Sequence, residues 1–255
     1  MEKATEFPYT CMISERDIAE KFTTIWKRSF PILTPNFMRV FNEAQIEAIN
    51  SNPAVTIDDD IRYDLVSEVS FNLSQIVIER SVEAVDYLSD DNNVMELLRK
   101  TAKFIWKSKN YSDDNLVLTN AETKDIVNIT NNTVEFITKT KRESLQFKPT
   151  LKGYNFISDL EADLLIDDTL YEVKTVNRNF KSTDLKQLFI YLALRQVSEH
   201  GAWKWAGLYN PRKGTYCKFN VNSLIYNLSG GNTPNEAFES LLEGLVRDME
   251  LDSTF

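Results

Sequence analysis

The stretch EADLLIDDTLYEVKTV, residues 161–176, decides the fold, because it is typical of a β-hairpin but carries charge on a face expected to be half-buried. If residues 167–168 form a two-residue turn, the register places Asp163 opposite Glu172. Side chains that face each other in antiparallel strands have Cβ atoms about 4.5–5.5 Å apart, and like charges there destabilise the pair. Because burying unpaired carboxylates is costly, the hairpin predicts a compensating partner.

We expect that partner to be a divalent cation, since Mg²⁺ accepts one or two protein carboxylates together with phosphate and water. Lys174 follows Glu172 by two residues, so both side chains leave the same face of the strand, about 6–7 Å apart. The Lys174 ammonium can then reach a scissile phosphate or an attacking water. Tyr171 and Val173 are expected to pack on the opposite face. The alternative is an exposed hairpin with cross-strand Glu–Lys pairs, in which Glu161 lies opposite Lys174.

Composition restricts the classes of protein. The chain has 255 residues, 42% hydrophobic and 11% aromatic, which is typical of a folded globular protein. No apolar run reaches the roughly 18 residues of a membrane span, and the start lacks the apolar centre of a signal peptide. Cys11 and Cys217 lie far apart, which indicates a reduced, cytoplasmic protein. The single histidine, His200, excludes paired-histidine zinc sites, and no phosphate-binding glycine motif occurs.

Charge is distributed unevenly. The net charge is −9, but residues 174–218 contain nine bases and two acids, so that segment is +7 and the remainder −16. A basic segment directly after the acidic hairpin suits a DNA phosphate backbone beside a metal site. The alternative is that these lysines and arginines only solvate a helix and a hairpin.

Apolar spacing predicts mainly helices in the first half of the chain and a mixed region in the second. Expected helices cover 13–30, 35–50, 61–88, 92–106, 182–200, 220–228 and 235–251, while 121–140 is left open between helix and strand. Ser182 or Thr183 is the expected cap of its helix. Expected strands cover 143–154, 161–167, 169–176, 203–211 and 214–221. The pattern predicts an α/β fold: a helical N-terminal region, 1–125, able to supply the first core helix, then a core, 126–255, with a small mixed sheet flanked by helices.

Asp163, eight intervening residues and then Glu172-Val173-Lys174 resemble the D-x(n)-(D/E)-x-K signature of the PD-(D/E)XK nuclease superfamily. The restriction-endonuclease-like and RecB-like branches are the most similar. Ala162 stands where many members have proline, which is the one departure. The resemblance covers about residues 145–225 and implies a restriction-endonuclease-like core.

A second match lies on the helix that follows. Gln187 and Tyr191 are four residues apart on one face and resemble the Q-x-x-x-Y element of the RecB-like branch. The resemblance implies that Asp163, Glu172 and the backbone carbonyl of Val173 bind Mg²⁺, with Mn²⁺ able to substitute, and that Lys174 is catalytic. The expected substrate-binding residues are Gln187, Tyr191, Lys181 and Arg178. An additional acid from an upstream helix would be Glu79 or Glu83, with Glu68 as a further candidate.

The sequence therefore predicts a Mg²⁺-dependent deoxyribonuclease that hydrolyses phosphodiester bonds. Analogy suggests a prokaryotic anti-phage defence or DNA-processing system, with DNA and an ATPase or helicase subunit as partners, and a homo-oligomer is compatible with it. One alternative is a catalytically silent, nuclease-like DNA-binding or assembly subunit. Another is a helical interaction protein, which the acidic last helix would suit.

Overall fold

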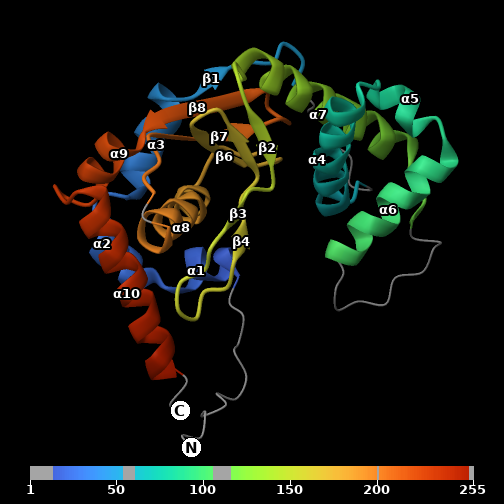
Figure 1. The fold of residues 1–255 in the computed structure, drawn as a ribbon. Helices are drawn as coiled ribbons and strands as arrows, with labels where there is room; N and C mark the ends of the chain where they lie inside the picture. The colour runs from blue at the N-terminus through green and yellow to red at the C-terminus, as the bar shows by residue number, and fades with distance from the viewer. Residues whose placement is uncertain (1–13, 54–60, 106–115, 200, 253–255) are drawn as a thin grey trace, which may run out of the picture.

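The computed structural model describes residues 14–53, 61–105, 116–199 and 201–252 (Figure 1). The strands are β1 (Glu47–Ala48), β2 (Leu145–Phe147), β3 (Thr150–Leu151), β4 (Leu160–Glu161), β5 (Leu164–Ile166), β6 (Thr169–Val173), β7 (Trp205–Asn210) and β8 (Thr215–Asn220). Six of them form a sheet of order β1-β8-β7-β6-β5-β2, and β3 pairs with β4 separately. Within the large sheet β6 and β7 are parallel and the other neighbours are antiparallel. The fold is α/β with a mixed sheet, as predicted.

The described chain has helices on both faces of this sheet and in a lobe beside it. They are α1 (Glu15–Lys21), α2 (Thr23–Ser29), α3 (Pro35–Ala44), α4 (Tyr63–Arg80), α5 (Ala84–Leu88), α6 (Asp91–Ile105), α7 (Asn120–Thr140), α8 (Ser182–Ser198), α9 (Val221–Leu228) and α10 (Pro234–Asp252). Helix α8 connects the parallel strands β6 and β7 and covers one face, while α7 covers the other (Figure 1). None of the helices in the described residues is both long and apolar enough to cross a membrane.

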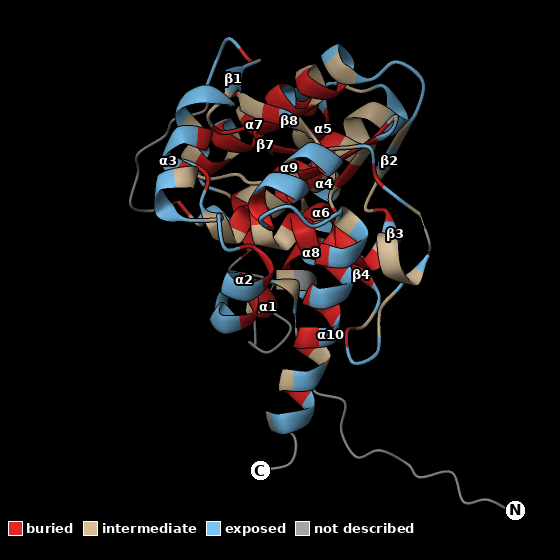
Figure 2. Ribbon diagram, turned by 90° about the vertical axis from the view of Figure 1, so that its left-hand side faces the viewer, coloured by how far each residue is buried: buried red, intermediate tan, exposed pale blue. Residues whose placement is uncertain are grey.

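Two hydrophobic clusters hold the helices on the sheet. On the α8 face, Leu170 and Leu208 pack in one cluster with Phe189 and with residues of α2 and α10. On the opposite face the Phe136 ring stacks on Tyr209, with 3.9 Å between centroids. Figure 2 shows the resulting concentration of buried residues in α8 and the central strands. The sheet is therefore buried on both faces, as expected of a strand–helix–strand crossover.

The N-terminal helices do not form a unit apart from the core. Ile18 of α1 and Trp26 of α2 belong to the same buried cluster as α8 and α10, and β1 extends the sheet by pairing with β8. Only α4 to α7 build a separate cluster, the helical lobe. The boundary expected at 125–126 falls inside α7, because that helix packs in the lobe with its first half and on the sheet with its second.

Residues 121–140, which the sequence left open between helix and strand, form helix α7. Thr119 accepts a hydrogen bond from the backbone N–H of Glu122, and the Glu122 carboxylate accepts one from the N–H of Thr119, which completes a capping box. Ile126, Ile129 and Phe136 then fall on its buried side. The Thr-x-x-Glu pattern was the sequence signal for this helix start.

The hairpin has the predicted register over its three paired positions, but Asp163 lies in a bend and is not part of the ladder with Glu172. Ile166 lies opposite Thr169, and Leu164 lies opposite Tyr171. Asp167 adopts a left-handed conformation, with φ of 53°, which aspartate tolerates better than most residues. Its carboxylate accepts hydrogen bonds from three successive backbone N–H groups, those of residues 142–144. These hydrogen bonds hold the segment between α7 and β2 against the turn of the hairpin.

Replacing Asp167 by Asn should lower the urea midpoint of unfolding at neutral pH. The N–H groups of Ser144 and Glu143 lower the pKa of the Asp167 carboxyl, so its contribution to stability is present above the unfolded-state pKa and is lost as the pH falls through the folded-state pKa. The difference between wild type and Asp167→Asn should accordingly disappear in acid. Asp168→Asn, at the exposed neighbouring position, is the control and should leave the midpoint unchanged at every pH.

Candidate metal centre

The predicted acidic couple lies where β5 begins and β6 ends. Asp163 occupies the bend before β5, and Glu172 lies in β6 on the same face as Leu170, toward α8. Tyr171 and Val173 pack on the opposite face with the α7 cluster, as predicted. Alternation along one five-residue strand therefore sets a carboxylate among apolar side chains.

The contacts of the couple are short and specific. Asp163 Oδ2 accepts the backbone N–H of Val173 at 2.6 Å. Glu172 is only 2% exposed, and its Oε1 lies 2.6 Å from Lys174 Nζ. Lys174 also donates a hydrogen bond to Gln187 Oε1. Glu172 Oε2 is buried and has no hydrogen-bond partner among the described residues. A buried carboxylate oxygen in this position needs either a bound cation or a proton shared with Asp163, and a side-chain hydrogen bond with Glu172 lowers the pKa of Asp163.

Burial and like charge oppose ionisation of both acids. Burial, followed by the negative charge of Asp163, raises the pKa of Glu172 to about 8. Burial likewise raises the pKa of Asp163 against the opposing charge of Lys174. Burial alone would lower the pKa of Lys174, but the charges of Glu172 and Asp163 outweigh it and raise that pKa. The single ammonium thus compensates the two carboxylates incompletely.

The donor set fits a hard cation such as Mg²⁺. Asp163 and Glu172 would supply carboxylate oxygens, and the backbone carbonyl of Val173, the residue after Glu172, would complete the set. The structure, within its described ranges, contains no group of three or more His, Cys, Asp or Glu side chains that could hold a metal ion by themselves. Mg²⁺ does not need one, because it keeps several waters and usually takes one or two carboxylates together with substrate phosphate.

Asp163 and Val173 line a cleft of about 250 Å³, whereas Glu172 and Lys174 are not among its lining residues. Its walls come from α1, α4, α8 and the segment between β3 and β5, and its lining includes Glu15, Glu68, Phe71, Lys148, Asp163, Gln187 and Tyr191. Gln187 Nε2 donates to Tyr191 Oη at 3.2 Å. The two residues of the Q-x-x-x-Y element therefore share one helical face beside the acids, where the sequence placed them.

Of the three candidates for an additional acid, the structure brings only Glu68 to the cleft. Glu68 Oε1 lies 3.3 Å from Lys148 Nζ, and its negative charge contributes to the raised pKa of Asp163. Glu79 accepts a hydrogen bond from Gln75 in the last turns of α4, and Glu83 precedes α5. Neither lines the cleft.

Glu15 is a cleft acid that the sequence analysis missed. It begins α1, and its Oε1 lies 3.5 Å from Gln187 Nε2. Its negative charge contributes to the raised pKa of Glu172. No local pattern connects an N-terminal helix with residues 150 positions later, so only the tertiary structure reveals this neighbour.

The two bases expected to bind phosphate, Arg178 and Lys181, lie outside the cleft, at the start of α8. Arg178 forms two hydrogen bonds, at 2.7 and 2.9 Å, with the Asp184 carboxylate. Lys181, not Ser182 or Thr183, is the N-cap of α8, and its backbone N–H also donates to Asp184. These contacts stabilise the start of α8. Arg178 is therefore a structural residue here, and neither side chain lines the cleft.

The rest of the basic segment is also dispersed. Arg212 is fully buried in an ion pair with Asp125, with 2.7 Å between Nη2 and Oδ2. The Arg195 guanidinium lies 3.8 Å from the Trp203 ring centroid. Packing against acids and aromatic rings therefore engages the three arginines of this segment.

Two further expectations concern single residues. Glu161 does not lie opposite Lys174: it belongs to β4 and pairs with Thr150, because the bend at Asp163 separates β4 from β5. Cys217 is buried as a free cysteine, and burial raises the pKa of its thiol to about 12. Its position agrees with an inert core residue. Cys11 and His200 lie outside the described residues.

Replacing Glu172 by Gln should stabilise the protein in EDTA at about pH 9, because it removes a buried charge beside Asp163. A carboxyl with a raised folded-state pKa destabilises the fold as pH rises from the unfolded-state value through the folded-state value. We expect a melting temperature at least roughly 4 °C higher, since 1 kcal/mol corresponds to about 2–4 °C for a chain of this size. At about pH 5 the gain should vanish.

The same measurement tests the cation. Mg²⁺ should raise the melting temperature of wild type and leave that of Glu172→Gln almost unchanged, because a ligand that binds only the folded state stabilises it. Glu79→Gln, which removes an exposed acid outside the cleft, should respond to Mg²⁺ like wild type. An equal response of wild type and Glu172→Gln would contradict a site at this couple.

Comparison with known proteins adds no relative. No family model matches the chain, and no curated protein matches it either. The interpretation of the site therefore depends on the geometry of the hairpin, on the orphaned oxygen of Glu172 and on the residues that line the cleft.

Proposed function

We propose that this protein is a Mg²⁺-dependent deoxyribonuclease that hydrolyses phosphodiester bonds in the cleft formed by α1, α4 and α8. The observation that carries the proposal is the buried Oε2 of Glu172, which has no hydrogen-bond partner among the described residues and lies beside Asp163. Lys174, two residues further along, forms an ion pair with Glu172. This combination of two acids and an ammonium supports phosphoryl chemistry.

The two acids would hold the cation together with the carbonyl of Val173. Bound Mg²⁺ supplies a coordinated water of lowered pKa and neutralises charge that develops on the phosphate. Hydrolysis forms a bond from the water oxygen to phosphorus and breaks one phosphorus–oxygen ester bond, and the proton lost by the water balances the leaving oxygen. The hydrogen bond from the Val173 N–H orients the Asp163 carboxylate.

Lys174 and the two residues of α8 would position the reacting groups. With Glu172 serving as a metal ligand, the Lys174 ammonium would be available to a phosphate oxygen or to the attacking water. Gln187 keeps Lys174 in place through its side-chain oxygen and contacts Tyr191 through its nitrogen. A DNA strand in the cleft would thus meet an ammonium and two side chains with hydrogen-bonding groups.

The wider setting is proposed by analogy alone. A nuclease of this size would act in the cytoplasm, in prokaryotic defence or DNA processing, and an ATPase or helicase subunit would control its access to DNA. A catalytically silent DNA-binding subunit is the second candidate. The observation that favours it is the tie of Lys174 to both Glu172 and Gln187, which leaves the ammonium engaged.

A cleavage assay separates the two candidates. Wild type should degrade linear, circular or single-stranded DNA in Mg²⁺ or Mn²⁺ and be inactive in EDTA. Lys174→Ala and Asp163→Asn should each reduce the rate by about 100-fold or more, the usual effect of removing one group that stabilises transition-state charge. Lys124→Ala, at an exposed position on α7, is the matched control and should retain full activity.

Two results would overturn the enzymatic proposal. Cleavage that persists in EDTA, or that Lys174→Ala leaves intact, would place the activity elsewhere. DNA binding by wild type without cleavage of any of the three substrates, with and without Mn²⁺, would favour the silent subunit.

A further inference from the structure

The rim of the cleft poses an electrostatic problem for DNA. Glu15, Glu68 and Glu161 line it, and the lysine among them, Lys148, is engaged by Glu68 and by Asn72. Phosphates on either side of the scissile one would therefore face carboxylates. Binding of a polyanion requires cations further along its path.

The three arginines after the hairpin do not meet this need. Arg178 is held by Asp184, Arg212 is fully buried with Asp125, and Arg195 stacks on Trp203. Exposed lysines near the cleft would then have to anchor the backbone.

Helix α6 adjoins the cleft through a chain of hydrogen bonds. Thr101 Oγ1 of α6 lies 3.3 Å from Asn72 Nδ2 of α4, and Asn72 Oδ1 accepts from Lys148 Nζ at 2.9 Å. Lys148 in turn contacts Glu68 in the cleft wall. Figure 1 shows α6 running from the outer edge of the helical lobe back toward β3 and β4. Its C-terminal half therefore lies on the cleft side of the lobe.

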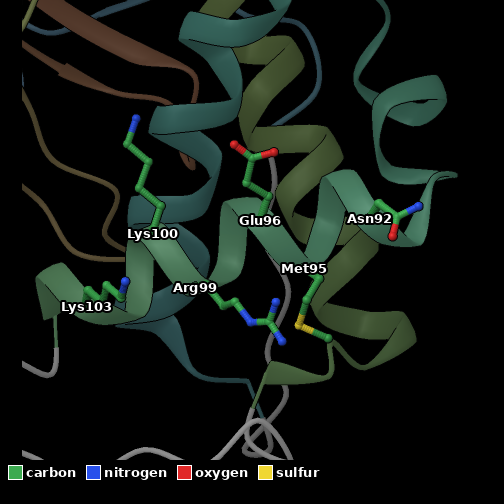
Figure 3. A pocket seen from close by; sticks show the side chains of 6 residues that line it. All are labelled: Asn92, Met95, Glu96, Arg99, Lys100 and Lys103. Carbon is green, nitrogen blue, oxygen red and sulfur yellow. The ribbon is translucent and has the colours of Figure 1, made fainter.

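That half of α6 is exposed and cationic. Lys100 and Lys103 are exposed, and they form no hydrogen bond or ion pair within the described part of the chain. With Arg99 and Glu96 they line a hollow of about 410 Å³ (Figure 3). Figure 3 shows both lysines toward the C-terminal end of the helix and Asn92 at its other end. Like charges three or four residues apart on a helix repel each other unless an anion lies between them.

We propose that Lys100 and Lys103 bind the phosphate backbone of DNA that extends from the cleft across α4. This inference rests on the proposed nuclease function and adds to it a second anchoring point outside the reacting centre. It implies a substrate long enough to reach α6. A short oligonucleotide that fills only the cleft would lack these contacts.

Affinity measurements with a catalytically inactive background test this proposal. Lys174→Ala and Lys174→Ala/Lys100→Ala/Lys103→Ala are titrated with a long and a short fluorescent DNA at several salt concentrations. Loss of two phosphate contacts should reduce the dependence of log Kd on log salt by about 2 for the long DNA. Affinity for the short DNA should not change. Arg39→Ala/Lys124→Ala in the same background removes two exposed cations elsewhere and should change neither value.

The outcomes separate this inference from the nuclease proposal. If wild type cleaves DNA but the salt dependence of the Lys100/Lys103 variant equals that of its background, the α6 anchor is wrong and the nuclease stands. An equal loss of affinity for short and long DNA would also overturn the anchor. Absence of both binding and cleavage by wild type would overturn the two proposals together. Circular dichroism of each variant verifies that the helices remain folded.

Discussion

The packing of α8 against β6 keeps the carboxylate of Glu172 out of water, and the local electrostatics of the cleft follow from this burial. One oxygen contacts Lys174, and the other has no donor within the described residues. Asp163, fixed by the N–H of Val173, adds a second negative charge beside it. An arrangement that costs free energy in the unliganded fold is typical of a functional site rather than of a stabilising one.

The scaffold around this couple connects elements that are far apart in sequence. Asp167 fastens the hairpin to the segment after α7, and the stacking of Phe136 on Tyr209 joins α7 to the sheet. Helix α4, packed on α7, then brings Glu68 to the cleft. The acids of the hairpin and those of the helices therefore occupy fixed relative positions, and a bound phosphate would meet a preorganised set of groups.

The sequence predicted the local part of this arrangement. Alternation between Leu170 and Lys174 and the two-residue turn at Asp167 were sufficient for the register, because side chains in a strand alternate with a period of two. Spacing of four placed Gln187 and Tyr191 on one helical face. Contacts between residues that are far apart in the sequence could not be predicted. Periodicity carries no information about which helix faces a strand, so Glu15 could not be found and Glu68 could not be ranked above Glu79.

The sequence also could not show which charged residues pair with one another. The basic character of residues 174–218 was correctly read from composition, but the partners of Arg178 and Arg212 depend on the packing of α8 and α7. Charge counted along a chain overstates the charge that a surface presents, since paired and buried cations contribute little to the external field. Exposed lysines that form no ion pair among the described residues, as on α6, are the better guide.

The buried ion pair between Arg212 and Asp125 has a mechanical consequence. It joins the β7–β8 turn to the first half of α7, and both side chains are fully inaccessible to water. A small displacement of the helical lobe would separate the two charges before solvent could enter, and a buried charge without its partner costs about 3–5 kcal/mol. Intermediate lobe positions are thus disfavoured, and the joint between lobe and sheet resists gradual bending: it either stays closed or opens completely.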